Sequence, residues 1–199
     1  MTTHTTGLRA ALITASVRQG RFGPVVSDWF AGRVRAHGAF EPDVIDLAGT
    51  GLPLELPGAG ATPPAGVAAA LGSLSERLSR ADAFVVITPE YNRSYPASLK
   101  NAIDWTHTEW QAKPVAFVSY GGLSGGLRAV EHLRPVFAEM HAVTIRETVS
   151  FHTAWEAFDA AGQPAAAERS EAAATALLDQ LAWWARALAD ARAARPYAA

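Results

Sequence analysis

Short apolar runs alternate along the chain with longer segments in which apolar positions recur every three or four residues. The short runs are typical of buried β-strands and the longer segments of amphipathic helices. Strands are expected at residues 8–14, 43–47, 83–88, 114–119 and 143–149. Helices are expected at residues 24–37, 65–80, 96–107, 125–140 and 164–193. This alternation predicts an α/β fold with a parallel sheet and helices on both of its faces.

Charged residues within the expected strands indicate the order of the strands in the sheet. The first, third and fourth strands are nearly continuous apolar runs, as expected of strands covered on both faces. The second carries Asp43 and Asp46 and the fifth carries Arg146 and Glu147, which edge strands tolerate. The five-stranded order 2-1-3-4-5 satisfies both observations. It places the topological switch point, where such folds bind ligands, between strands one and three.

Composition excludes several classes of protein. The chain has 199 residues, a formal net charge of −2 and no cysteine. Its length suits one domain, so residues 1–199 are predicted to form one. The charge argues against a nucleic-acid partner, and the missing cysteines exclude disulfides and thiolate metal sites. A polar start and no apolar stretch of about 20 residues predict no membrane partner and a cytoplasmic location.

The loop at residues 14–24 has the composition of an anion site. It combines a small hydroxyl residue, glycines and two arginines between an expected strand and an expected helix. Backbone N–H groups and the helix dipole attract an anion there, and Arg18 can donate two hydrogen bonds to a phosphate. The loop lacks the Gly-Lys-Ser/Thr of a Walker loop and the Gly-x-Gly-x-x-Gly of a dinucleotide loop. A capped helix start with solvated arginines is the alternative.

Two further loops follow the third and fourth strands. Residues 89–96 read PEYNRSYP, and a tight turn of this kind can present several backbone N–H groups to the carbonyls of a planar ring. Residues 119–129 contain four glycines, which permit close approach of the backbone to a planar ligand. Both loops belong to the edge of the sheet that holds the predicted anion site.

In this order the three loops resemble those of the NADPH-dependent FMN reductase family, which consists of flavodoxin-like flavoproteins. The resemblance implies that Ser16 and Arg18 hold the FMN phosphate, with Ala15 in place of the usual glycine. It also implies that the turn at residues 89–92 lies along the edge of the flavin ring, and that Arg93 stands where the family often has glycine. The cofactor-binding residues implied in this way are Ser16, Arg18, Gln19, Gly20, Arg21, Phe22, Pro89, Glu90, Tyr91, Asn92, Arg93, Ser119, Tyr120, Gly121 and Gly122.

The same resemblance implies an oxidoreductase. A hydride from NAD(P)H would pass by way of bound FMN to a small-molecule acceptor such as a quinone, an azo compound, chromate or free flavin. No side chain is expected to act as a general acid or base, and this includes Glu90. The alternative is a flavodoxin-type electron carrier without NAD(P)H reductase activity of its own.

Several other residues carry weaker expectations. The family implies a homodimer or homotetramer, with Trp105 and Trp110 either at the interface or in the core. The loop at residues 49–64 is either a surface excursion or a rim over the site or a subunit contact. The six histidines lack metal-binding spacing, so no metal site is expected. Trp155 and Phe158, after the last strand, are interpreted as packing residues, with a role in covering a site as the alternative.

Overall fold

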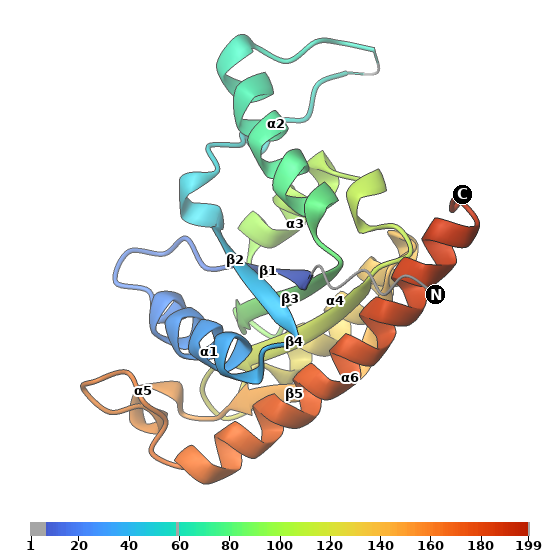
Figure 1. Ribbon diagram of the computed structural model, residues 1–199. Helices are drawn as coiled ribbons and strands as arrows, with labels where there is room; N and C mark the ends of the chain where they lie inside the picture. Colours follow the sequence, from blue (N-terminus) through green and yellow to red (C-terminus); the bar gives the residue numbers. More distant parts are fainter. Residues whose placement is uncertain (1–6, 59, 199) are drawn as a thin grey trace.

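A five-stranded parallel sheet forms the centre of the protein. The structure is a computed structural model, and it describes residues 7–58 and 60–198. The strands are β1 (Leu8–Thr14), β2 (Phe40–Asp46), β3 (Ala83–Pro89), β4 (Pro114–Tyr120) and β5 (Val143–Phe151). Their order is β2-β1-β3-β4-β5, with every neighbouring pair parallel (Figure 1). The predicted order is therefore confirmed, and the fold is flavodoxin-like.

Helices cover both faces of this sheet. The longer ones are α1 (Gly23–His37), α2 (Ala65–Arg80), α3 (Ala97–Trp105), α4 (Leu127–Glu139) and α6 (Ala167–Ala194). The short ones are η1 (Leu47–Gly49), η2 (Thr108–Trp110) and α5 (Ala154–Ala157). Helices α1 and α6 pack on one face of the sheet, and α2, α3 and α4 pack on the other (Figure 1).

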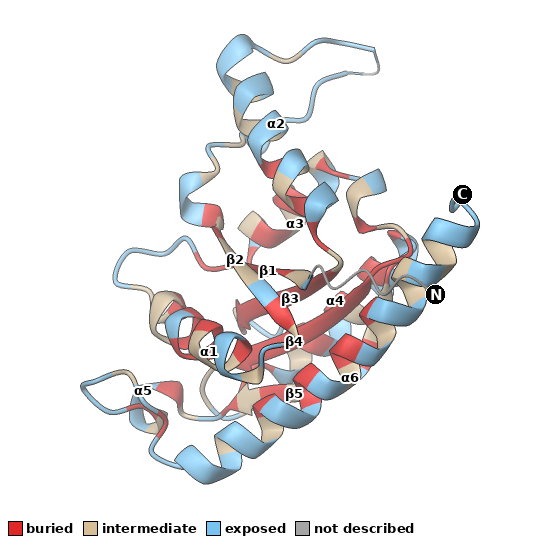
Figure 2. Cartoon of the chain, in the orientation of Figure 1, coloured by how far each residue is buried: buried red, intermediate tan, exposed pale blue. Residues whose placement is uncertain are grey.

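Burial explains why the central strands are so apolar. All residues of β3 and β4 are buried, whereas the edge strands β2 and β5 are mostly half-buried, with a few buried positions and one exposed position each (Figure 2). Phe84 and Phe117 project from β3 and β4 into the layer beneath α4, where they meet Trp110 and Phe137. Fully burying aromatic side chains of this size stabilises a fold by about 1.5–3 kcal/mol each.

Of the two roles expected for Trp110, the core is the one that the structure supports, and the preferred interface role is wrong. Its side chain is 1% exposed, and its ring Nε1 donates a hydrogen bond to Thr106 Oγ1 at 2.8 Å. A residue enclosed in this way cannot contact a second subunit. Trp105 is half-buried, and its Nε1 donates to the Pro53 carbonyl at 2.9 Å. With the bond from Asn101 to the Leu52 carbonyl, this fixes the start of the 49–64 loop on α3.

Several element boundaries differ from the expected ones. β2 begins at Phe40 and β5 continues to Phe151, because neighbouring strands extend the pairing beyond the apolar runs. Helix α4 begins at Leu127 rather than residue 125, since Gly125 and Gly126 have φ angles of 60° and 86° that no right-handed helix allows. Helix α6 begins at Ala167 because Pro164 instead pairs with Phe158 in an isolated bridge.

Candidate functional site

A cleft of about 430 Å³ opens at the carboxyl edge of the sheet, where β1, β3 and β4 end. It contains every predicted site residue except Asn92, Arg93 and Ser119. Its lining consists of Ser16, Arg18, Gln19, Gly20, Arg21, Phe22, Pro89, Glu90, Tyr91, Tyr120, Gly121, Gly122, Ala154 and Trp155. An adjoining hollow of about 380 Å³ shares Arg18, Glu90 and Tyr91 with the cleft and adds Asn92.

The first loop of the cleft leads into the N-terminus of α1. Gly20 takes a left-handed φ of 62°, whereas Ala15 does not, so the turn requires no glycine at Ala15. Within the described residues, the backbone N–H groups of residues 17–20 form no hydrogen bond. Residues 18–20 line the cleft just before the positive end of the α1 dipole, and free N–H groups at such a place favour an anion.

The two arginines of this loop have different surroundings. Arg21 makes a two-pronged ion pair with Asp46 at 2.5 and 2.6 Å and also donates to the Ser16 carbonyl at 2.7 Å. The hydrogen bond from Arg21 holds the pKa of Asp46 below its usual range. Arg18 is exposed and has no ion-pair partner among residues 7–58 and 60–198. Arg21 therefore ties the loop to the end of β2, while Arg18 is available to a ligand.

A buried hydroxyl group points toward the same helix terminus. Tyr120 is 5% exposed, and its hydroxyl has no hydrogen-bond partner in the described part of the chain. It lies so close to α1 that a Cβ atom at Gly23 would sit 2.9 Å from it. Burial raises the pKa of the Tyr120 phenol, so it stays protonated as a donor. An unpaired buried donor costs about 1–3 kcal/mol, which a ligand oxygen would relieve.

The second loop is a two-residue turn. Tyr91 and Ser94 exchange backbone hydrogen bonds of 2.8 and 3.0 Å, and between them Asn92 and Arg93 have φ angles of 49° and 70°. Positive φ at both central positions defines a type I′ turn, which explains the family's frequent glycine at the position of Arg93. The Tyr91 hydroxyl also contacts the Ser16 hydroxyl at 2.7 Å, which joins the first two loops.

Glu90 joins the second loop to the third. Its carboxylate accepts hydrogen bonds from the Ser124 hydroxyl and from both the side chain and the backbone N–H of Arg128, at 2.9 and 3.2 Å. Burial alone would raise the pKa of Glu90, but these donors outweigh it and hold the pKa below its usual range. Glu90 thus stays ionised and paired, which fits the expectation that it is not an acid or a base.

The third loop turns back over the end of β4. Gly121 N–H donates to the Phe151 carbonyl at 3.1 Å, which ties the loop to β5. Ser119 is fully buried, and its hydroxyl donates to the Gly125 carbonyl at 2.8 Å. The Ser119 side chain therefore supports the loop from below and does not line the cleft.

Two residues of the cleft, Ala154 and Trp155, lie outside the implied set of site residues. Packing was the preferred role for Trp155 and covering a site was the alternative; Trp155 is 66% exposed and lies at the cleft, in the short helix α5 after β5. Phe158 is 9% exposed and packs against Phe22 and Phe151, as expected. The position of Trp155 in the chain could have indicated its place at the cleft, because it follows β5, which ends at the same edge of the sheet as β1, β3 and β4.

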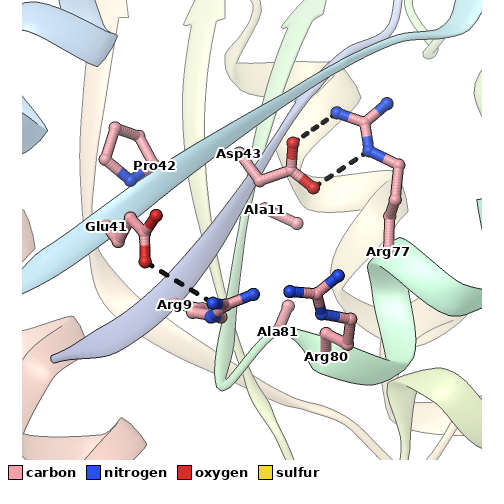
Figure 3. Close-up of a pocket in the computed structure, with 8 residues that line it drawn as sticks. All are labelled: Arg9, Ala11, Glu41, Pro42, Asp43, Arg77, Arg80 and Ala81. Carbon is pink, nitrogen blue, oxygen red and sulfur yellow. Dashed lines mark hydrogen bonds and ion pairs between the residues drawn. The ribbon is translucent and has the colours of Figure 1, made fainter. Parts of the chain in front are cut away.

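A second hollow, of about 330 Å³, lies between the amino halves of β1 and β2 and the end of α2 (Figure 3). Its charges largely neutralise one another. Arg77 holds Asp43 with two hydrogen bonds, and Arg9 lies 3.7 Å from Glu41. Arg80 pairs with Glu76 on its own helix at 3.5 Å. Of these pairs, Arg77–Asp43 docks α2 on the edge strand β2, so the charges of the hollow are explained by pairing within the fold.

Two classes of site are not found in residues 7–58 and 60–198. No helix there is both long and apolar enough to cross a membrane. No group of three or more histidine or acidic side chains is placed to hold a metal ion.

The sheet order and the position of the cleft define a class, the flavodoxin-like proteins that bind a ligand across the carboxyl edge at the switch point. Within this class the chain belongs to the NADPH-dependent FMN reductase family, whose model matches residues 8–156. It is 37% identical over 122 residues to an NAD(P)H-dependent FMN reductase of Schizosaccharomyces pombe, covering 58% of each chain. It is 38% identical over 87 residues to a quinone reductase of Escherichia coli, covering 41% of this chain and 46% of that one. The matched part thus spans about half the length of these relatives.

Solved structures agree on the fold. The flavoenzyme NAD(P)H:acceptor oxidoreductase FerB of Paracoccus denitrificans superposes with a TM-score of 0.71 at 24% identity, covering 90% of this chain and 98% of that one. An oxidoreductase of Corynebacterium diphtheriae superposes with a TM-score of 0.66 at 20% identity, covering 91% and 98%. At these identities the likeness concerns the fold alone.

Proposed function

We propose that the protein is an NAD(P)H-dependent oxidoreductase that binds FMN non-covalently in the cleft and reduces a small-molecule acceptor. The observation that carries the proposal is the buried Tyr120 hydroxyl at the start of α1, which has no hydrogen-bond partner among residues 7–58 and 60–198, near a loop whose N–H groups at residues 17–20 are likewise free there. A phosphate monoester supplies the acceptor oxygens and the negative charge that this place lacks. Family membership supports the same ligand.

The residues present fit FMN. Arg18, the Ser16 hydroxyl and the N–H groups of residues 17–20 would hold the phosphate. At the turn, the Glu90 and Tyr91 N–H groups already donate to the Tyr120 and Ser94 carbonyls at 3.2 and 2.8 Å. The donors left for the carbonyls of a flavin ring are therefore the N–H groups of Asn92 and Arg93.

FMN, when bound, supplies the capacity to accept a hydride and pass on its electrons. With a quinone as acceptor, NAD(P)H, a proton and the quinone give NAD(P)⁺ and the hydroquinone. This chain would bind and orient the ring, with no side chain needed as an acid or a base. We further propose a quinone or a related compound as the acceptor, a single domain, a homodimer or homotetramer, and a cytoplasmic location.

A titration tests the cofactor site. Arg18→Ala is expected to raise the dissociation constant for FMN roughly tenfold to a hundredfold, because it removes a charge-assisted contact of about 1.5–3 kcal/mol. Arg186→Ala, at an exposed arginine of α6, is the matched control and should bind as the wild type does. Hydride transfer at saturating FMN should be unchanged. Equal FMN affinity in the Arg18 variant would contradict the assignment.

A turnover assay tests the reaction. The FMN-loaded protein should oxidise NADPH or NADH in the presence of a quinone without any partner reductase. Failure with both nicotinamides, in a protein that does bind FMN, would contradict the reductase proposal and favour the electron-carrier alternative.

A further inference from the structure

The exposed Trp155 ring stands at a fixed place beside the cleft. Thr153 N–H donates to the Gly122 carbonyl and Ala154 N–H to the Gly121 carbonyl, each at 3.0 Å. These bonds tie the start of α5 to the third loop at the carboxyl edge of the sheet (Figure 1). A Cβ atom at Gly122 would lie 3.5 and 4.0 Å from two atoms of the Trp155 ring, so the ring edge stands directly over this glycine.

The backbone at this point is held in an uncommon conformation. Thr153, the residue before α5, has a φ of 46° and a ψ of 54°, in the left-handed region that β-branched residues avoid. Glu156 N–H and Ala157 N–H both donate to the Thr153 carbonyl, at 2.8 and 3.2 Å, which closes the short helix. In this conformation Ala154 is buried and the Trp155 side chain is exposed at the cleft.

Trp155 differs from the aromatic residues around it. Phe151 and Phe158 are 5% and 9% exposed and belong to the core, whereas about two thirds of Trp155 is open to solvent. Among the described residues, its side chain makes one hydrogen bond, a 3.3 Å contact from Nε1 to the neighbouring Glu156. The open ring can therefore stack on a planar ligand that enters the cleft.

We infer that Trp155 is a specificity-determining residue that favours planar aromatic electron acceptors over inorganic oxidants. This inference rests on the proposed function. Offset-stacked or edge-to-face aromatic pairs gain stability beyond the area they bury, and a naphthoquinone acceptor provides an aromatic ring in its fused benzene ring. A hydrated inorganic complex such as ferricyanide has no aromatic face and gains nothing from Trp155.

The test compares two acceptors and three variants of the FMN-loaded protein. Trp155→Ala should lower kcat/KM for menadione, a planar quinone, roughly threefold to tenfold, mainly through KM. Reduction of ferricyanide, which takes two equivalents per NADPH, should stay within about twofold of wild type. Trp155→Phe should keep most of the menadione activity. Trp183→Ala, at a 63%-exposed tryptophan of α6, is the matched control and should change neither reaction.

Calorimetric titration of menadione into the oxidised FMN-loaded protein, without nicotinamide, gives a readout that needs no turnover. The dissociation constant should rise in Trp155→Ala by the same factor as KM and stay unchanged in Trp183→Ala. Because this measurement needs no turnover, it can support or contradict the role of Trp155 even if the protein proved not to be a reductase. The inference about Trp155 and the proposed function can therefore fail separately. The inference is overturned if menadione binding and KM are unchanged, if both acceptors lose activity equally, or if only FMN affinity falls.

Discussion

Gly126 offers the sharpest test of how the third loop is built. Its φ is 86°, and a Cβ atom there would lie 2.7 Å from Ser119 Cβ and 2.9 Å from the Tyr120 backbone nitrogen. Both atoms belong to the end of β4, which is paired with β3 and β5 and cannot swing aside. Gly126→Ala therefore combines an unfavourable backbone conformation with a clash against rigid atoms.

The expected loss of stability in Gly126→Ala is the sum of a backbone term and a packing term. A non-glycine residue in the left-handed region costs about 1–2 kcal/mol. Forcing an extra methyl group into a packed place costs about 1–3 kcal/mol. The sum is about 2–5 kcal/mol, a large part of the roughly 5–15 kcal/mol that stabilises a typical domain. At about 2–4 °C per kcal/mol, a loss near 3 kcal/mol lowers the midpoint of thermal unfolding by roughly 6–12 °C.

Urea and thermal unfolding of two further glycine variants make the test specific. At Gly125 the close neighbours of a Cβ atom are the side-chain ends of Ser150 and His152, which can move, so Gly125→Ala should cost only the backbone term of about 1–2 kcal/mol. Gly72, inside α2, has no atom within 4 Å of its Cβ position, so Gly72→Ala should stabilise by about 0.5–1 kcal/mol. The reasoning is refuted if Gly126→Ala unfolds within about 0.5 kcal/mol of wild type, or if Gly125→Ala proves the more damaging change.

Three further predictions concern the ties around the cleft. Arg93→Gly should stabilise the fold by about 1 kcal/mol in urea unfolding, since glycine accepts the positive φ of the turn; a loss of stability would contradict this. Asp46→Asn should raise the FMN dissociation constant roughly threefold to tenfold, because it weakens the ion pair that holds Arg21 in the first loop. Asp43→Asn weakens a similar ion pair outside the cleft and should leave the FMN dissociation constant unchanged. Glu90→Gln should be less stable than wild type at pH 7. Because the pKa of Glu90 is lowered by folding, that difference should shrink as the pH falls below about 4.5 and through the folded-state pKa; a gap that widens in acid would show the sign to be wrong.

The fold could be predicted from the sequence because the burial of each strand determines its pattern of apolar and charged residues. A strand covered on both faces must be apolar throughout, and an edge strand need not be, so the charges at Asp43 and Arg146 identified the two edge strands, with which the order 2-1-3-4-5 agrees. Once the order was known, the loops after β1, β3 and β4 had to meet at one edge. The cleft lies there for that reason.

Which side chains pair with one another within the cleft could not be predicted in the same way. Arg18 and Arg21 are three residues apart and chemically identical, and only the fold brings Asp46 to Arg21 and leaves Arg18 open. The burial of Ser119 likewise depends on how Gly125 and Gly126 fold back over β4. Trp155 was assigned to packing because an apolar residue after a strand usually packs, and its exposure follows from the conformation of Thr153.

The ties between loops explain how a cleft built from separate segments can exist before any ligand arrives. The contact between the Ser16 and Tyr91 hydroxyls joins the first loop to the second, and the Glu90–Arg128 pair joins the second to the third. A serine hydroxyl has one donor and two acceptor positions, so Ser16 can accept from Tyr91 and still donate to a phosphate oxygen. A ligand can therefore bind without breaking these contacts between the loops, and little conformational entropy is lost in ordering them. A side chain such as Arg128, which holds Glu90, thereby contributes to the affinity for a ligand indirectly, by keeping the loops in place.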